Sequence, residues 1–171
     1  TLRQYFPDAE VIGVDGALPM LAKASQQIDG TQHVLQKLFS RLFHSSAAAM
    51  ADELICANFA QLPMRAGAFD MIWSNLALHW HPMPDVVFPE WSRLLRQEGL
   101  LMFACFGPDT CKELRQIFQS LGYSHQMLPF VDMHDLGDML GQNGFAAPVM
   151  DMEQLTLTYA TAQDLLNDVR A

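Results

Sequence analysis

The chain has 171 residues, half of them hydrophobic, and a formal net charge of −9 at pH 7. This length and apolar content allow one domain with a buried core, and no apolar run is long enough to span a bilayer. The negative charge argues against nonspecific nucleic-acid binding, because phosphate backbones attract basic surfaces. No signal-peptide pattern is visible, and the three cysteines lack metal-ligand spacing. The sequence therefore predicts a single-domain, cytoplasmic α/β protein whose Cys56 and Cys105, in predicted strands, are buried reduced thiols.

The first third of the chain predicts a strand, a helix and a second strand. Residues 9–14 form the first strand, which ends at Asp15-Gly16, and residues 19–28 carry apolar side chains at helical spacing. An inserted segment near 29–52 contains an amphipathic helix, and residues 53–57 form the next strand. Asp15 could accept two hydrogen bonds from the vicinal hydroxyls of a ribose, but Asp-Gly is also an ordinary turn pair.

The second strand is followed by Asn58 and Phe59. The amide oxygen of Asn58 could accept a hydrogen bond from the exocyclic amine of adenine, and Phe59 could cover the ring. Alternatively, Asn58 caps its own turn and Phe59 is a core aromatic residue. Both alternatives remain open from this loop alone.

The segment from Phe69 to Phe106 predicts a βαβ unit of a parallel sheet. Its two apolar runs are short and continuous, which is typical of strands covered on both faces. Between them, Pro84 to Gln97 predicts a helix with Asp85 as its N-cap, and Gly99 predicts a turn. Ligands of such sheets bind beyond the carboxyl ends of the strands.

The last third of the chain predicts three helices and two antiparallel edge strands. In chain order these are a helix over 109–121 capped by Asp109 or Thr110, a helix over 132–140, strands over 147–152 and 155–159, and a helix opened by Thr161 or Gln163. His125 and His134 are not at metal-ligand spacing with nearby aspartates, so no metal site is predicted.

Together these strand ends resemble the class I S-adenosylmethionine-dependent methyltransferases. The landmarks are Asp15-Gly16, Asn58-Phe59 before Leu62-Pro63, Phe69-Asp70, Asn75 and the Arg-x-Leu-x-x-x-Gly-Leu pattern from Arg93. The runs 106–115 and 148–159 further resemble the biotin-synthesis methyltransferases, which methylate the free carboxylate of malonyl-acyl carrier protein. The resemblance implies a Rossmann-like sheet, mostly parallel with an antiparallel last strand and with helices on both faces.

The resemblance also implies S-adenosylmethionine as cofactor and assigns residues to it. Asp15 would hold the ribose, Gly16 and Met20 would line the nucleoside, Asn58 and Phe59 would meet adenine, and Asn75 and Leu76 would border the methionine end. Two positions depart from the family pattern: Asn58 stands where Asp is usual, and Ala17 where Ser is usual.

The family's first strand and its Gly-rich loop would lie before Thr1, and nothing in the sequence replaces them. We therefore expect a partial methyltransferase domain over residues 1–171, part of a longer enzyme, that binds the cofactor poorly by itself.

The implied chemistry requires that the methyl donor and acceptor be held in line more than it requires a catalytic side chain. Methyl transfer is an in-line displacement, and a malonyl carboxylate is already ionised near neutral pH, so no catalytic residue is predicted. His79 and Trp80 could shape the acceptor pocket, although His79 could equally be a hydrogen-bonding residue at a helix start. The basic residues Arg93, Arg96, Lys112 and Arg115 could dock an acidic carrier protein, or could be ordinary solvated helix faces.

Other functions are compatible with the same motifs. A relative of this lineage, the methyltransferase-like assembly factor of respiratory complex I, hydroxylates an arginine of a partner protein. A different methyl acceptor such as a quinone precursor, or a non-catalytic interaction module that has lost cofactor binding, is also open.

Overall fold

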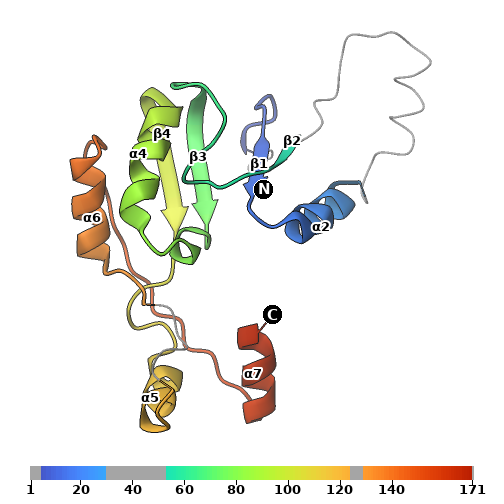
Figure 1. Cartoon of the computed structure of the whole chain (residues 1–171), viewed down its shortest axis with the longest axis vertical. Coiled ribbons are helices and arrows are strands. Elements are labelled where there is room, and N and C mark those ends of the chain that lie inside the picture. Colours follow the sequence, from blue (N-terminus) through green and yellow to red (C-terminus); the bar gives the residue numbers. More distant parts are fainter. Residues whose placement is uncertain (1–4, 30–52, 124–128, 171) are drawn as a thin grey trace. The chain divides into compact units, whose positions relative to one another are not determined.

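The computed structural model describes residues 5–29, 53–123 and 129–170. The chain divides into two compact units, residues 1–104 and 105–171 (Figure 1). The expectation of a single domain across 1–171 stays a prediction. The predicted amphipathic helix within 29–52 and the residue His125 lie outside the described residues.

The first unit opens with the predicted strand, helix and strand. β1 (Ile12–Asp15) pairs in parallel with β2 (Glu53–Cys56), and α2 (Leu18–Asp29) follows β1 in the chain. The pairing continues past both strands, because the backbone N–H of Ala57 donates to the carbonyl of Asp15 at 3.2 Å. The ends of β1 and β2 therefore lie side by side.

The predicted βαβ unit is confirmed in the same unit. β3 (Phe69–Asn75) and β4 (Leu95–Ala104) are parallel, and α4 (Val87–Leu94) connects them after two short 3-10 helices, η1 (Leu78–Trp80) and η2 (Pro84–Val86) (Figure 1). The N–H of Leu76 donates to the carbonyl of Ala104, so the ladder extends to the carboxyl ends of both strands. No ladder joins this pair to β1 and β2 within the described chain.

The connecting helix is shorter than predicted, because its last residues join the sheet. Phe69 pairs with Leu95 but Met71 pairs with Leu100, so residues 96–99 form a bulge in β4. Gly99 is needed there, since a Cβ on it would lie 2.9 Å from the backbone oxygen of Arg96. The predicted N-cap is also wrong: Asp85 lies inside η2, and α4 has no side-chain cap.

One face of the β3–β4 pair is buried under α4. Phe88 and Trp91 of the helix contact Phe103 of β4, with ring centroids 5.9 and 6.3 Å apart. On the opposite face, Trp73 and its partner Met102 are each about half exposed. The prediction that both faces are covered therefore holds for one face only among the described residues.

The second unit contains α5 (Lys112–Ser120), α6 (Met133–Gln142) and α7 (Ala162–Arg170). α6 starts where the side chain of Asp132 accepts from the N–H of His134, and α7 starts where Thr161 accepts from the N–H of Asp164. The predicted cap of α5 is wrong, because Cys111 takes that position in a left-handed conformation with no side-chain cap.

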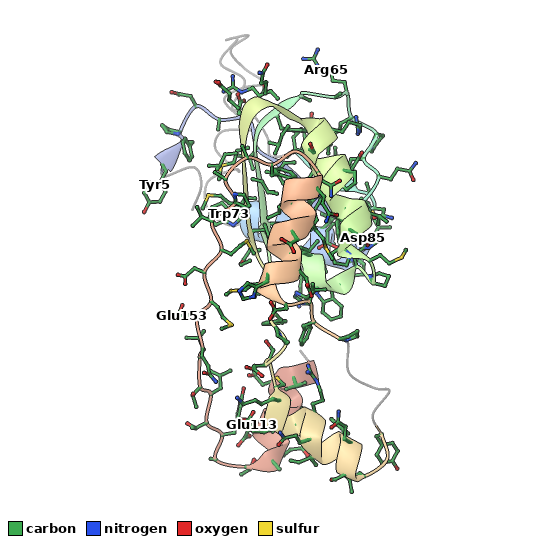
Figure 2. All side chains as sticks on the ribbon, turned by 90° about the vertical axis from the view of Figure 1, so that its left-hand side faces the viewer. Tyr5, Arg65, Trp73, Asp85, Glu113 and Glu153 are labelled. Atoms are coloured by element: carbon green, nitrogen blue, oxygen red, sulfur yellow. The ribbon has the colours of Figure 1, made fainter. Side chains whose placement is uncertain are left out.

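The two predicted edge strands over 147–152 and 155–159 do not form a ladder in the structure. Figure 2 shows the chain around Glu153 extended, with side chains projecting from it. Val149, Leu155 and Leu157 are largely exposed, and no strand among the described residues pairs with this stretch to bury them.

The three cysteines are free thiols, but they are less buried than predicted. Cys56 and Cys111 are exposed, and only Cys105 is half-buried, where burial raises the pKa of its thiol. Cys56 is accessible because it ends a strand of a two-stranded sheet. Within the described ranges, no helix has the length and apolar content needed to cross a bilayer.

Candidate functional site

Asp15 lies at the carboxyl end of β1 and forms a turn. Its Oδ1 accepts a hydrogen bond from the N–H of Ala17 at 2.7 Å, which is the Asx turn expected of an Asp-Gly pair. No other contact engages this carboxylate within the described residues. A carboxylate has room for several donors, so the turn fixes the group and leaves acceptor positions for two hydroxyls.

Gly16 offers open space next to this carboxylate. A Cβ at this position would meet only the backbone oxygen of Ala57, at 3.9 Å. The described fold therefore does not require glycine here, whereas close approach of a ligand would. Met20, on the first turn of α2, is about half exposed. Contact of these residues with a nucleoside stays a prediction.

Asn58 and Phe59 begin the loop after β2. Asn58 is exposed, and its Oδ1 accepts from the N–H of Ala60 at 2.9 Å, so it caps its own turn. Phe59 is half-buried, with its ring 5.8 Å from that of His81 and 6.4 Å from that of Trp91. Both local alternatives are thus present, and contact with adenine stays a prediction.

The strand ends are connected through this loop. Pairing of β1 with β2 places Asn58 beside the Asp15 turn, and the edge-to-face contact of Phe59 with His81 reaches the segment after β3. At the end of β3, Asn75 is exposed and Leu76 has a φ of +50°, an unusual conformation for a bulky residue. The structure therefore links the loop after β2 to the Asp15 turn on one side and to the segment after β3 on the other.

His79 and Trp80 lie in η1, directly after this turn. The neighbouring Leu78 is fully buried and anchors the short helix, while Trp80 is 70% exposed. Burial lowers the pKa of the His79 imidazole, which favours its neutral form near pH 7. The pair presents an imidazole and an indole, 5.4 Å apart between centroids.

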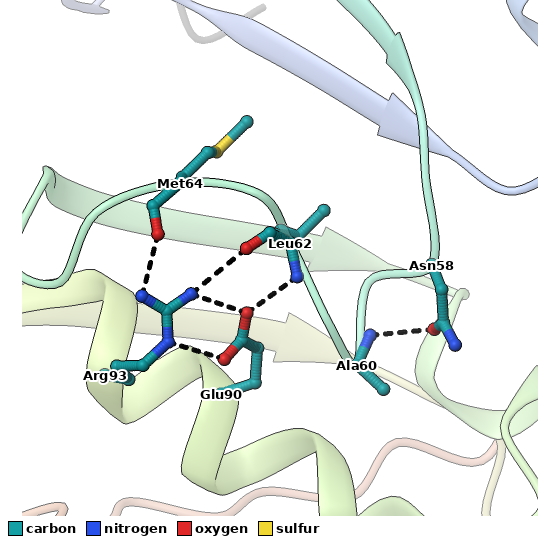
Figure 3. A network of polar contacts seen from close by, with 6 residues as sticks. All are labelled: Asn58, Ala60, Leu62, Met64, Glu90 and Arg93. Carbon is teal, nitrogen blue, oxygen red and sulfur yellow. Dashed lines mark hydrogen bonds and ion pairs between the residues drawn. The ribbon is translucent and has the colours of Figure 1, made fainter.

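The predicted docking arginines have different environments. Arg93 donates to the carbonyls of Leu62 and Met64 and to the carboxylate of Glu90 (Figure 3). Among the described residues, Arg96 pairs with Asp70, in an exposed ion pair of 2.7 Å.

Arg115, in the second unit, donates to the carbonyls of Pro108 and Thr110, and its guanidinium lies 5.7 Å from the ring centre of Phe130. Arg93 and Arg115 thus each have partners within their own unit, and Arg93 remains 37% exposed. A docking role for these four basic residues, Lys112 included, stays a prediction.

Glu90 is the residue of this region that the sequence analysis missed. Its side chain is only 12% exposed, and Oε1 accepts from the N–H of Leu62 at 2.7 Å. The hydrogen bond from Arg93 lowers the pKa of Glu90, and the same contact raises the pKa of Arg93. The sequence did contain a signal for this pair: an acidic residue three positions before an arginine on a predicted helix can form an ion pair with it.

No group of three histidine, cysteine, aspartate or glutamate side chains is placed to hold a metal ion in the part of the chain that the structure describes. The candidate residues of the first unit lie at or just after the carboxyl ends of parallel strands, which is where open α/β sheets bind their ligands.

The sequence matches the methyltransferase domain family over residues 1–103. It is 44% identical over 170 residues to a malonyl-[acyl-carrier protein] O-methyltransferase of Laribacter hongkongensis and 43% identical to one of Gallionella capsiferriformans. Each match covers 99% of this chain and 54% of the relative. The chain thus spans about half the length of the curated relatives it matches.

Solved structures share the fold at low sequence identity. One is a Bacillus halodurans protein whose assignment as a methyltransferase is provisional, with a TM-score of 0.59, 19% identity, and coverage of 84% of this chain and 56% of that one. Another is the YcgJ protein of Bacillus subtilis, with a TM-score of 0.53, 19% identity, and coverage of 80% and 53%. The chain belongs to the methyltransferase domain family and has the Rossmann-like α/β fold of the class I methyltransferases.

Proposed function

We propose that the whole protein transfers a methyl group from S-adenosylmethionine to the free carboxyl of malonyl-acyl carrier protein, a step of biotin synthesis. The observation that carries this proposal is the 44% identity, over 99% of the chain, to a relative named for that reaction. The general family match ends at residue 103, whereas this likeness continues through the second unit. A methyltransferase of another specificity would share the first part more than the second.

The residues at the strand ends suit the nucleoside part of the cofactor. Asp15 would accept hydrogen bonds from the ribose hydroxyls, and the open space at Gly16 would admit the nucleoside. Phe59 would cover the adenine ring, with its own position fixed by Trp91 and His81. When bound, S-adenosylmethionine supplies a methyl group on a positively charged sulfur.

The acceptor requires orientation instead of deprotonation. A malonyl carboxylate is ionised near neutral pH, so its oxygen can attack the methyl carbon as the carbon–sulfur bond breaks on the opposite side. His79 and Trp80, in η1 directly after the end of β3, would form part of the wall against which the acceptor lies. Because burial favours a neutral His79, this wall would add no second positive charge.

The partner is an acyl carrier protein bearing the malonyl group. A carrier of this kind is usually acidic, and a protein with a net charge of −9 needs local basic surface to dock it. Arg96 is the arginine of α4 and β4 that suits this role, because it is 61% exposed and has only the exposed Asp70 as its partner in the described structure.

Transfer of labelled methyl to malonyl-acyl carrier protein by the full-length protein tests the proposal. We expect transfer to the malonyl form and none to acetyl-acyl carrier protein, which lacks the free carboxyl. Asp15→Ala should raise KM for S-adenosylmethionine by about 10- to 100-fold, because it removes charge-assisted hydrogen bonds.

Cofactor binding without transfer to either carrier would contradict the proposed acceptor and favour another substrate or the assembly-factor reaction. Absence of cofactor binding by the full-length protein would contradict methyl transfer itself and favour the interaction module.

A further inference from the structure

The loop from Asn58 to Met64, which follows β2, is held at its far end by α4. Both backbone polar groups of Leu62 are bound by α4. Its N–H donates to Oε1 of Glu90 at 2.7 Å, and its carbonyl accepts from Nη2 of Arg93 at 3.2 Å (Figure 3). The carbonyl of Met64 accepts from Nη1 of Arg93 at 2.7 Å. This irregular loop therefore has its backbone groups satisfied by side chains of a helix about 30 residues further along the chain.

The two side chains also hold each other. Nε and Nη2 of Arg93 each donate to one oxygen of Glu90, both at 2.7 Å, in the paired geometry of a guanidinium and a carboxylate. Glu90 is 12% exposed and Arg93 37% exposed, so the carboxylate is the more sheltered partner and solvent still reaches the guanidinium. We refer to Glu90 and Arg93, with their contacts to Leu62 and Met64, as the loop clamp.

The near end of the loop is fixed in other ways. Asn58 forms a turn through the N–H groups of Ala60 and Gln61, and Phe59 contacts Trp91, which follows Glu90 on α4. The loop is thus tied to α4 at Phe59 and again at Leu62 and Met64. These ties set the position of Phe59 relative to the helix, and that of Asn58, which directly precedes it.

We propose that the loop clamp positions the adenine-binding part of the cofactor site, so that Glu90 and Arg93 act as positioning residues for S-adenosylmethionine. This inference rests on the proposed function, because it assigns the clamp a role in that site. A loop that is already ordered loses less conformational freedom when a ligand binds, and the ligand consequently binds more tightly. For Arg93 the inference is an alternative to the docking role expected from the sequence.

Binding of S-adenosylhomocysteine to the full-length protein, measured by calorimetry, tests the proposal. Arg93→Met should weaken binding by roughly tenfold, and Glu90→Gln should weaken it by a smaller factor because the amide can still accept from Leu62. Arg65→Met is the matched control: Arg65 follows the same loop, is exposed and takes no part in the clamp. The control should leave the dissociation constant within about twofold of wild type.

Steady-state kinetics distinguish a specific effect on the cofactor site from a general destabilisation of the enzyme. In Arg93→Met, KM for S-adenosylmethionine should rise, while kcat and KM for malonyl-acyl carrier protein stay near wild type. If Arg93→Met does not fold, the test uses Glu90→Gln and Arg93→Lys instead. The lysine keeps the charge but loses the paired geometry.

The outcomes are distinct. A lowered melting temperature with unchanged S-adenosylhomocysteine affinity would overturn the positioning role. A raised KM for the carrier substrate with unchanged cofactor affinity would overturn it in favour of docking. Failure of the wild-type protein to bind S-adenosylhomocysteine would instead overturn the proposed function.

Discussion

The two units of the chain differ in how they bury their apolar side chains. In the first unit, α4 and the residues beside it form the core, with Leu78, Val87, Phe88 and Leu94 buried at 1% exposure or less. In the second unit, the stretch between α6 and α7 leaves Val149, Leu155 and Leu157 exposed. The candidate site belongs to the first unit, and the loop clamp ties the loop from Asn58 to Met64 to α4, the helix that carries most of these buried side chains.

This comparison predicts where substitutions act on stability. Phe88 is fully buried between Trp91 and Phe103, whereas Leu157 is 71% exposed. Phe88→Ala should therefore lower the free energy of unfolding by about 3–5 kcal/mol, and Leu157→Ala by less than about 0.5 kcal/mol. Urea unfolding of the full-length variants measures both values. Equal losses would show that residue 157 is packed in the native protein.

Two glycines, one in each unit, differ in the same way in how closely the backbone around them is packed. Gly99 lies in the bulge of β4, where a Cβ would approach the oxygen of Arg96 to 2.9 Å, and Gly141 lies in α6 with nothing within 4 Å. Gly99→Ala should cost about 1–3 kcal/mol of unfolding free energy, while Gly141→Ala should add about 0.5–1 kcal/mol. Thermal unfolding should move the two melting temperatures in opposite directions. A neutral Gly99→Ala would contradict the tight bulge.

The loop clamp predicts a smaller, pH-dependent effect. Arg93 holds the pKa of Glu90 below its ordinary value of 4.5 in the folded state, so the stability from ionised Glu90 is present above that value. It is lost as the pH falls through the lowered, folded-state pKa. Glu90→Gln should be less stable than wild type by about 1 kcal/mol at pH 7, with a smaller difference near pH 3.

The control for this measurement is Asp70→Asn, which breaks the exposed pair with Arg96 and should change stability by about 0.5 kcal/mol or less. A pH-independent difference between Glu90→Gln and wild type would show that ionisation of Glu90 does not stabilise the fold.

Local sequence patterns predicted the elements of the first unit well. The strands at 12–15, 53–56 and 69–75 and the parallel βαβ connection are confirmed, because short apolar runs ended by turn residues determine them locally. The helix end was wrong, because the pairing of Phe69 with Leu95 draws the residues after Leu94 into the sheet. Such pairing depends on a partner about 25 residues away, which periodicity does not reveal.

The candidate site was predicted only where it depends on local sequence. The turns at Asp15 and Asn58 follow from their own sequence, and the structure has both. Arg93 was expected on a solvated face, since its acceptors, the carbonyls of Leu62 and Met64, lie about 30 residues earlier in an irregular loop. The predicted edge strands at 147–159 failed because alternating side chains indicate a strand without supplying its neighbour.

A crystal structure of the full-length protein with S-adenosylhomocysteine would test the account most directly. We predict that both ribose hydroxyls donate to Asp15, that adenine lies against Phe59 beside Asn58, and that Glu90 and Arg93 keep their contacts with Leu62 and Met64. A nucleoside bound away from the ends of β1 and β2, with Asp15 and Phe59 untouched, would contradict the site and the positioning role together.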